Sequence, residues 1–206
     1  EVFKMNTAPE SKSKKALDKF ADVSAKIGNE VHLRSLRDAF ALIMPIFILA
    51  GLGVLINNVL LPLIVHGTAL SNSQIWGTMI TNGSLNIAGL LLAPAIAFNL
   101  AKNKSFESPM AAAIVGISSL IMVMPLNLSL ATVKNAAKTA NVTGALSFAN
   151  LGTTGMFAGI IIGLLATELF ISLSRVKQFK INIGENVPPA VASGFSSMIP
   201  VILTLS

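Results

Sequence analysis

One acidic residue stands inside a long apolar stretch of this chain and is the first candidate for chemistry. Glu168 is the only charged residue between Lys138 and Arg175. A carboxylate at this position would lie within a membrane span, where ionisable groups are costly and usually functional. The plainer interpretation is that Glu168 sits near the cytoplasmic end of the span, two helical turns before Arg175 and on the same face, and reaches the membrane surface or a partner cation.

Three amide side chains are the candidates for binding a ligand. Asn82, Asn86 and Asn150 lie in or beside apolar segments. Amides both donate and accept hydrogen bonds, so they pair well with the hydroxyls of a sugar. The alternative is that they bond one helix to another, because lipid offers no hydrogen-bond partner.

The residues needed for metal binding, thiol chemistry or group transfer are missing from the sequence. The absence of cysteine excludes disulfides, thiol catalysis and cysteine metal sites. His32 and His66 have no metal-ligand spacing, and His66 is expected in an exposed loop. The sequence holds no nucleophile–base pair, P-loop or GxGxxG motif. We therefore expect no phosphoryl or acyl chemistry in this chain, and no cofactor.

The elements that must position these residues are membrane helices. The 206 residues are 53% hydrophobic and 12% charged, with a mean hydropathy of +0.73. Soluble domains carry about 25% charged residues, and about 20 apolar residues cross a bilayer as a helix. The predicted spans are residues 39–65, 76–100, 109–124, 151–174 and 189–206, the last incomplete or just complete. The predicted fold is an all-α integral membrane bundle.

The segments between these spans are predicted from their polar and breaking residues. Pro45 falls in the first turns of the first span, while Asn57-Asn58 and Pro62 predict an end or a bend before that apolar run is over. Residues 66–75 are expected to be a short uncharged loop. Residues 126–150 are too polar to span, and are expected to hold a short helix or a hairpin.

Small residues recur at helical spacing in the fourth span. Gly155, Gly159 and Gly163 form two overlapping GxxxG patterns, which let two helices approach closely. The partner helix is expected within the same chain or, alternatively, in a second protomer.

The N-terminal segment is polar and basic. Residues 1–4 are expected to be a cloning remnant before Met5, and residues 5–37 a cytoplasmic segment whose part 16–37 forms an amphipathic helix, on the membrane surface or packed on another cytoplasmic part of the protein. Residues 38–206 are expected to form the membrane domain.

The basic residues predict the topology. Of the 15 Lys and Arg residues, 12 fall in this segment and in the two loops after the second and fourth spans, against Lys134 and Lys138 on the other side and Lys4 in the remnant. This asymmetry places the N-terminus in the cytoplasm and argues against nucleic-acid binding.

Four strings in order resemble a known family. They are HLRSLRDAF at residues 32–40 with Met44-Pro45, TGALSFANLG at 143–152, the acid Glu168, and NVPPAVASGF at 186–195 with Ile199-Pro200. Together they resemble the lactose/cellobiose/chitobiose-type enzyme IIC, the membrane permease of the phosphoenolpyruvate-dependent sugar phosphotransferase system.

This resemblance implies a fold and a function that the residues alone do not give. The family has about ten spans, and this chain resembles its N-terminal scaffold and dimer half. The whole permease would carry a disaccharide across the bacterial plasma membrane for phosphorylation by IIB, which is recharged through IIA. No position matches the family's sugar-binding residues, which lie in the other half. The basic loop with Arg175, Lys177 and Lys180 is a candidate docking surface for IIB.

Two other classes of function remain. The chain could be a stand-alone membrane scaffold or docking protein without transport activity. It could also be half of an unrelated transporter built from repeats, although the first two spans and the next two show no convincing repeat.

Overall fold

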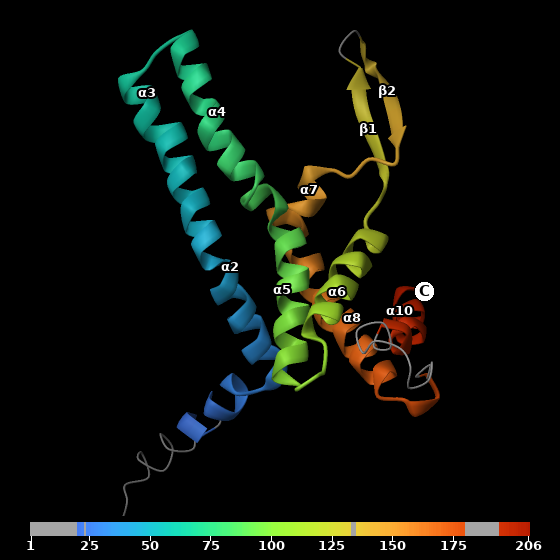
Figure 1. Cartoon of the computed structure of the whole chain (residues 1–206). Helices are drawn as coiled ribbons and strands as arrows, with labels where there is room; N and C mark the ends of the chain where they lie inside the picture. Colours follow the sequence, from blue (N-terminus) through green and yellow to red (C-terminus); the bar gives the residue numbers. More distant parts are fainter. Residues whose placement is uncertain (1–19, 23, 133–134, 180–193) are drawn as a thin grey trace, which may run out of the picture.

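The computed structural model describes residues 20–22, 24–132, 135–179 and 194–206, and most of these are helical (Figure 1). Three helical stretches are long and apolar enough to cross a membrane: Val31–Ile64, Thr68–Asn103 and Thr153–Ser174. A shorter apolar helix, α6 (Pro109–Val123), lies between the second and the third. These helices confirm the predicted fold class.

The first stretch comprises α2 (Val31–Leu55), a π-helical segment (Ile56–Leu60) and α3 (Leu61–Ile64). It begins eight residues before the expected start at residue 39, because Glu30 caps it: its side chain accepts hydrogen bonds from the N–H groups of His32 and Leu33. The expected surface helix over residues 16–37 is therefore broken before residue 31, and only residues 20–22 and 24–28 of its earlier part are described as helical. Pro45 consequently lies inside α2 rather than in its first turns.

The helix does not end at Asn57-Asn58, but continues as the π-helical segment. Asn57 Nδ2 donates to the carbonyl oxygen of Gln74, and Gln74 Nε2 donates to the carbonyl oxygen of Asn57, each over 2.9 Å. π-helical turns are rare and occur mostly as single-turn bulges inside α-helices, as here. The reciprocal bonds join this part of the first stretch to α4 (Thr68–Asn82).

Residues 68–75, expected to be a loop, belong to α4. The connection is instead residues 65–67, where Gly67 adopts φ +67°, a backbone conformation that favours glycine. α4 is followed by a short 3-10 turn, Leu85–Ile87, and then by α5 (Ala88–Asn103). The polar sequence of α4 suggested a loop, yet its amides and hydroxyls bond within the helix hairpin.

The polar segment after α6 folds as a β-hairpin, one of the two forms expected. β1 (Asn127–Thr132) pairs with β2 (Asn135–Thr143) in antiparallel register, from Asn127 opposite Thr143 to Ala131 opposite Thr139. The hairpin extends away from the helices (Figure 1).

The last described elements return along the bundle. α7 (Phe148–Leu151) and a 3-10 turn (Thr153–Gly155) lead into α8 (Met156–Ser174), which is followed by a 3-10 turn (Lys177–Phe179). α10 (Met198–Leu205) belongs to the fifth apolar run. Pro188 and Pro189, expected to open that run, lie outside the described residues.

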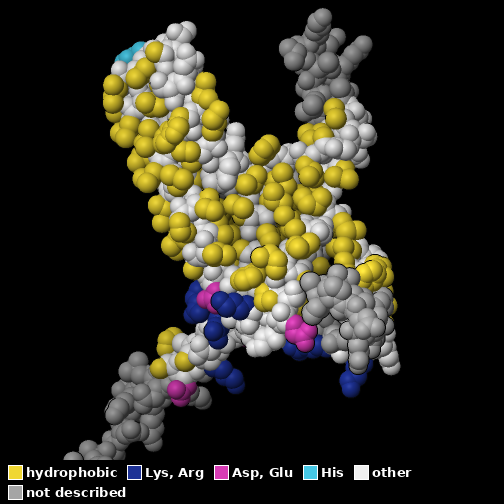
Figure 2. All heavy atoms as spheres, in the orientation of Figure 1, with side chains coloured by type: hydrophobic (Ala, Val, Ile, Leu, Met, Phe, Trp, Pro, Cys, Tyr) yellow, Lys and Arg dark blue, Asp and Glu magenta, His cyan; other side chains and the backbone are white. Residues whose placement is uncertain are grey.

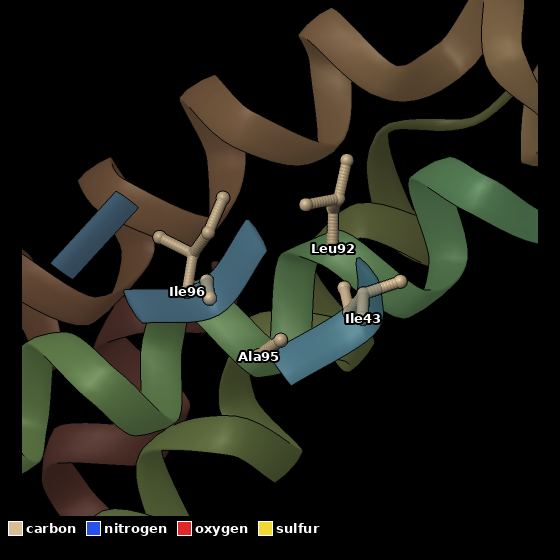
Figure 3. Packing of buried hydrophobic residues seen from close by; sticks show 5 residues of the cluster. Ile43, Leu92, Ala95 and Ile96 are labelled. Atoms are coloured by element: carbon tan, nitrogen blue, oxygen red, sulfur yellow. The ribbon is translucent and has the colours of Figure 1, made fainter. Parts of the chain in front are cut away.

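α5 is the central helix and packs against α2, α6 and α8 (Figure 1). Ala88, Ala93, Ala97 and Ala101 are buried along it, and small side chains of this kind let neighbouring helices approach closely. Figure 3 shows Ile43 of α2 against Leu92, Ala95 and Ile96 of α5.

Charged side chains gather at one end of the bundle, where α2 begins and α5 and α8 end (Figure 2). We call this the basic end. Its Lys and Arg residues include Arg34, Arg37, Lys102, Lys104, Arg175 and Lys177. The flanks above it are largely apolar (Figure 2), as the surface of a helical bundle that faces lipid must be.

Candidate functional site

Glu168 lies at the basic end of α8, where it joins three helices. Its Oε1 atom is 2.5 Å from His32 Nε2 of α2, and it forms an ion pair with Lys104 Nζ, directly after α5. Glu168 and Lys104 are partly buried, with side chains 29% and 21% exposed. A carboxylate held by two groups on two other helices fixes the relative positions of the three helix ends.

His32 lies between two carboxylates. Its Nδ1 atom is 2.6 Å from Glu30 Oε1, while Nε2 faces Glu168. A neutral imidazole has one N–H donor, whereas the protonated ring has two. The geometry is therefore that of an imidazolium that donates to both acids, and with Lys104 the four residues form a charge-balanced network.

Glu30 anchors this network from outside the spans. It accepts hydrogen bonds from the backbone N–H groups of His32 (2.8 Å) and Leu33 (3.0 Å). The bond from Leu33 and then that from the His32 ring hold the pKa of Glu30 below its ordinary value. Glu30 thus stays ionised at the start of α2, where the helix dipole favours a negative charge.

The network couples the ends of three helices, so it positions these elements relative to one another. The sequence drew attention to Glu168 but not to His32 or Lys104. The expected partner cation of Glu168 is Lys104, and Arg175 donates to the carbonyl oxygen of Lys104 over 3.4 Å. The sequence offered one signal that could have pointed to these partners. An acid in an apolar helix needs a cation, and another helix that ends on the same side of the membrane can supply it.

The three candidate amides belong to segments that meet near the start of α5, at the opposite end of that helix. Asn86 Nδ2 donates to Asn82 Oδ1 over 2.7 Å. The backbone of Asn86 lies against Gly152, and that of Asn150 against Gly155. Two helix breaks, one before α5 and one before α8, thus meet at these residues. The bond between Asn82 and Asn86 uses part of the hydrogen-bonding capacity of these two side chains within the chain itself. A role in binding a sugar remains a prediction.

The glycines of α8 lie against α5. A Cβ atom at Gly159 would lie 2.6 Å from the carbonyl oxygen of Gly89, and one at Gly163 would lie 2.9 Å from that of Ala93. A Cβ atom at Gly89 would likewise lie 2.8 Å from the carbonyl oxygen of Gly155. Of the two partners considered for this stripe, the structure places the helix of the same chain against it.

The basic loop after α8 is described only in part. Arg175 and Lys177 are exposed at the basic end. Lys180 lies outside the described residues.

The bundle defines a class before any comparison is made: an integral membrane protein of several helices with one strongly basic end. Within that class, the model of the family "Phosphotransferase system, EIIC" matches residues 37–206. The chain belongs to this family.

Curated relatives agree with the family match. The chain is 26% identical over 187 residues to the lichenan permease IIC component of Bacillus subtilis (strain 168), covering 89% of this chain and 40% of that protein. It is 28% identical over 185 residues to the oligo-beta-mannoside-specific EIIC component of the same organism, with the same coverage of both chains. It is 24% identical to a cellobiose-specific EIIC component of Geobacillus stearothermophilus, covering 89% of this chain and 41% of the relative.

A solved structure shares the fold. The crystal structure of ChbC, the IIC component of an N,N'-diacetylchitobiose-specific phosphotransferase system, superposes with a TM-score of 0.77 at 23% identity, over 92% of this chain and 44% of that one. The chain thus spans less than half the length of the proteins that it matches.

Proposed function

We propose that the chain is the N-terminal scaffold part of a IIC permease that carries a disaccharide of the cellobiose, lactose or chitobiose class across the bacterial plasma membrane. The observation that carries this proposal is the family match over residues 37–206. Relatives named for lichenan, oligo-beta-mannosides and cellobiose support the choice of sugar class.

In this mechanism the scaffold is fixed and the sugar is held by the other part of the permease. Movement of that part against the scaffold would carry the sugar inward, where a phosphorylated IIB protein, recharged through IIA, would phosphorylate it. The tightly packed α5–α8 contact suits a rigid scaffold, because backbone atoms in van der Waals contact leave little room for sliding.

The intact mass of the native gene product tests this assignment. A mass roughly twice the 21.5 kDa of this chain is expected, since a full permease must include the sugar-binding part. A native product of about this chain's own mass would contradict the proposal, and would favour a stand-alone membrane scaffold or docking protein.

We further place the basic end in the cytoplasm and a homodimer contact on a face other than the glycine stripe. The positive-inside rule supports the first, because Lys and Arg gather at one end of the bundle (Figure 2). The packing of α5 against Gly159 and Gly163 supports a dimer contact on another face.

The exposed cations after α8 are the proposed docking surface for IIB. Replacing Arg175, Lys177 and Lys180 by Glu should lower sugar phosphorylation at least several-fold at normal membrane levels, and added IIB should partly restore it. The matched control is Lys102→Glu, a reversal at the same end outside the loop. Unchanged phosphorylation in the triple variant would remove this docking surface.

A further inference from the structure

A pocket of about 790 Å³ lies at the basic end, between the start of α6, the end of α8 and the start of α10. Its lining divides into two kinds of residue. Arg175, Glu107, Ser108 and Ser174 supply polar groups, whereas Met110 and Ile114 supply an apolar wall. The pocket does not include the Glu168 network or the three candidate amides.

The polar part of the pocket suits a phosphate group. α6 starts here with Pro109, no side chain caps it, and the N–H groups of Met110 and Ala111 in its first turn have no acceptor within the helix. Such a helix start attracts anions. Arg175 adds a guanidinium, whose planar donors match phosphate oxygens in pairs.

An unpaired hydroxyl points independently to a ligand. The Ser174 hydroxyl oxygen is buried and has no hydrogen-bond partner in the described part of the chain. Buried polar atoms are nearly always paired, so this hydroxyl has an unused hydrogen-bonding capacity that a group bound in the pocket can take up. Ser174 lines the same pocket as Arg175, one position before it.

The apolar part distinguishes a lipid from a free phosphate. Met110 and Ile114 are four residues apart on α6, so they share one face, and they are 62% and 59% exposed. They lead from the charged end toward the apolar flank of the bundle. A free phosphate would gain nothing from this wall, whereas an acyl chain would be covered by it.

Glu107, at the exposed rim, decides which headgroup fits. A carboxylate beside the phosphate site disfavours a second negative charge, yet accepts a hydrogen bond from a hydroxyl. We propose that this pocket binds one phosphatidylglycerol, with its phosphate at Arg175 and the start of α6, its glycerol hydroxyls at Glu107, and an acyl chain along Met110 and Ile114.

Native mass spectrometry of the purified protein in detergent tests the proposal without IIB or sugar. The probes are phosphatidylglycerol, phosphatidylcholine, which lacks headgroup hydroxyls, and inorganic phosphate. One phosphatidylglycerol should be retained at least fivefold more strongly than phosphatidylcholine, and Arg175→Gln should lower its binding about tenfold. Lys102→Gln, the same charge change at the same end but outside the pocket, should leave binding unchanged.

Three outcomes would overturn this assignment. Equal retention by the wild type and Arg175→Gln would remove the site. Equal losses in Arg175→Gln and Lys102→Gln would mean general attraction of acidic lipid to the basic end. Displacement of the lipid by millimolar inorganic phosphate would identify a phosphate site rather than a lipid site. Thermal unfolding of both variants without lipid shows whether each is folded.

Discussion

At the scale of single residues, the Glu168 network stands out because its members come from distant parts of the chain. His32, Lys104 and Glu168 meet only because the start of α2 lies beside the ends of α5 and α8 (Figure 1). Composition could identify Glu168 as unusual, since it is the one acid in its apolar run. Its partners could not be predicted, because no local spacing connects residues 32, 104 and 168.

Glu168→Gln should lower the stability of the protein by about 1 kcal/mol. The substitution removes the charge that Lys104 and His32 share, but the network is partly exposed, and exposed ion pairs contribute little. Thermal unfolding in detergent measures the change. Glu107→Gln, in an exposed acid at the same end, is the matched control, and equal effects in both variants would mean that the network adds no stability.

The start of α2 should loosen in acid. The pKa of Glu30 lies below its ordinary value near 4.5, so the cap stabilises fully above that value and is lost as the pH falls through the lower, folded-state pKa. Hydrogen exchange at the amides of His32 and Leu33, corrected for intrinsic rates, should therefore become faster below that pKa. Glu30→Gln should show weaker protection that no longer depends on pH in this way. If the protection of these amides in the wild type stays unchanged down to pH 3, Glu30 does not have this role.

At the scale of elements, the α5–α8 contact is the most sharply defined, because glycine backbones touch along it. Gly159→Ala should destabilise the protein by about 2 kcal/mol, since a Cβ at this position meets the backbone oxygen of Gly89 at 2.6 Å and the helices must separate. The helix propensity gained from alanine, up to about 1 kcal/mol, offsets only part of this cost.

Gly51→Ala is the control, because that helical glycine has no neighbour within 4 Å of a built Cβ. We expect its stability to be unchanged or slightly raised in thermal unfolding. If the two alanine variants behave alike, the contact between α5 and α8 is not tight in solution.

The apolar runs predicted which elements exist better than where they end. Lipid requires helices with internally satisfied backbones, so uncharged runs indicate spans directly. The start of α2 was missed because a Glu cap and a basic first turn resemble a surface segment. α4 was partly missed because Ser, Asn and Gln suggest a loop, and the bonds between Gln74 and Asn57 of the first stretch are visible only in the structure. The β-hairpin was one of the forms expected for the polar segment.

At the scale of the whole molecule, the basic end and the apolar flanks predict one orientation in the membrane. The chain has no cysteine, so a single substitution introduces one thiol into this part of the protein. His66→Cys, in the turn before α4, should react with a membrane-impermeant maleimide on intact cells. Lys102→Cys, at the basic end, should react only after the membrane is permeabilised. The opposite pattern would invert the proposed topology.

The central claim is that this chain forms part of a sugar permease of the phosphotransferase system. Its most direct test is phosphoenolpyruvate-dependent phosphorylation of radiolabelled cellobiose and chitobiose, using membranes from the source strain with and without the gene, supplemented with IIA, IIB and the general phosphocarriers. We predict that disruption of the gene abolishes phosphorylation of at least one sugar and that the intact gene restores it. Undiminished phosphorylation of both sugars in the disrupted strain would contradict the account.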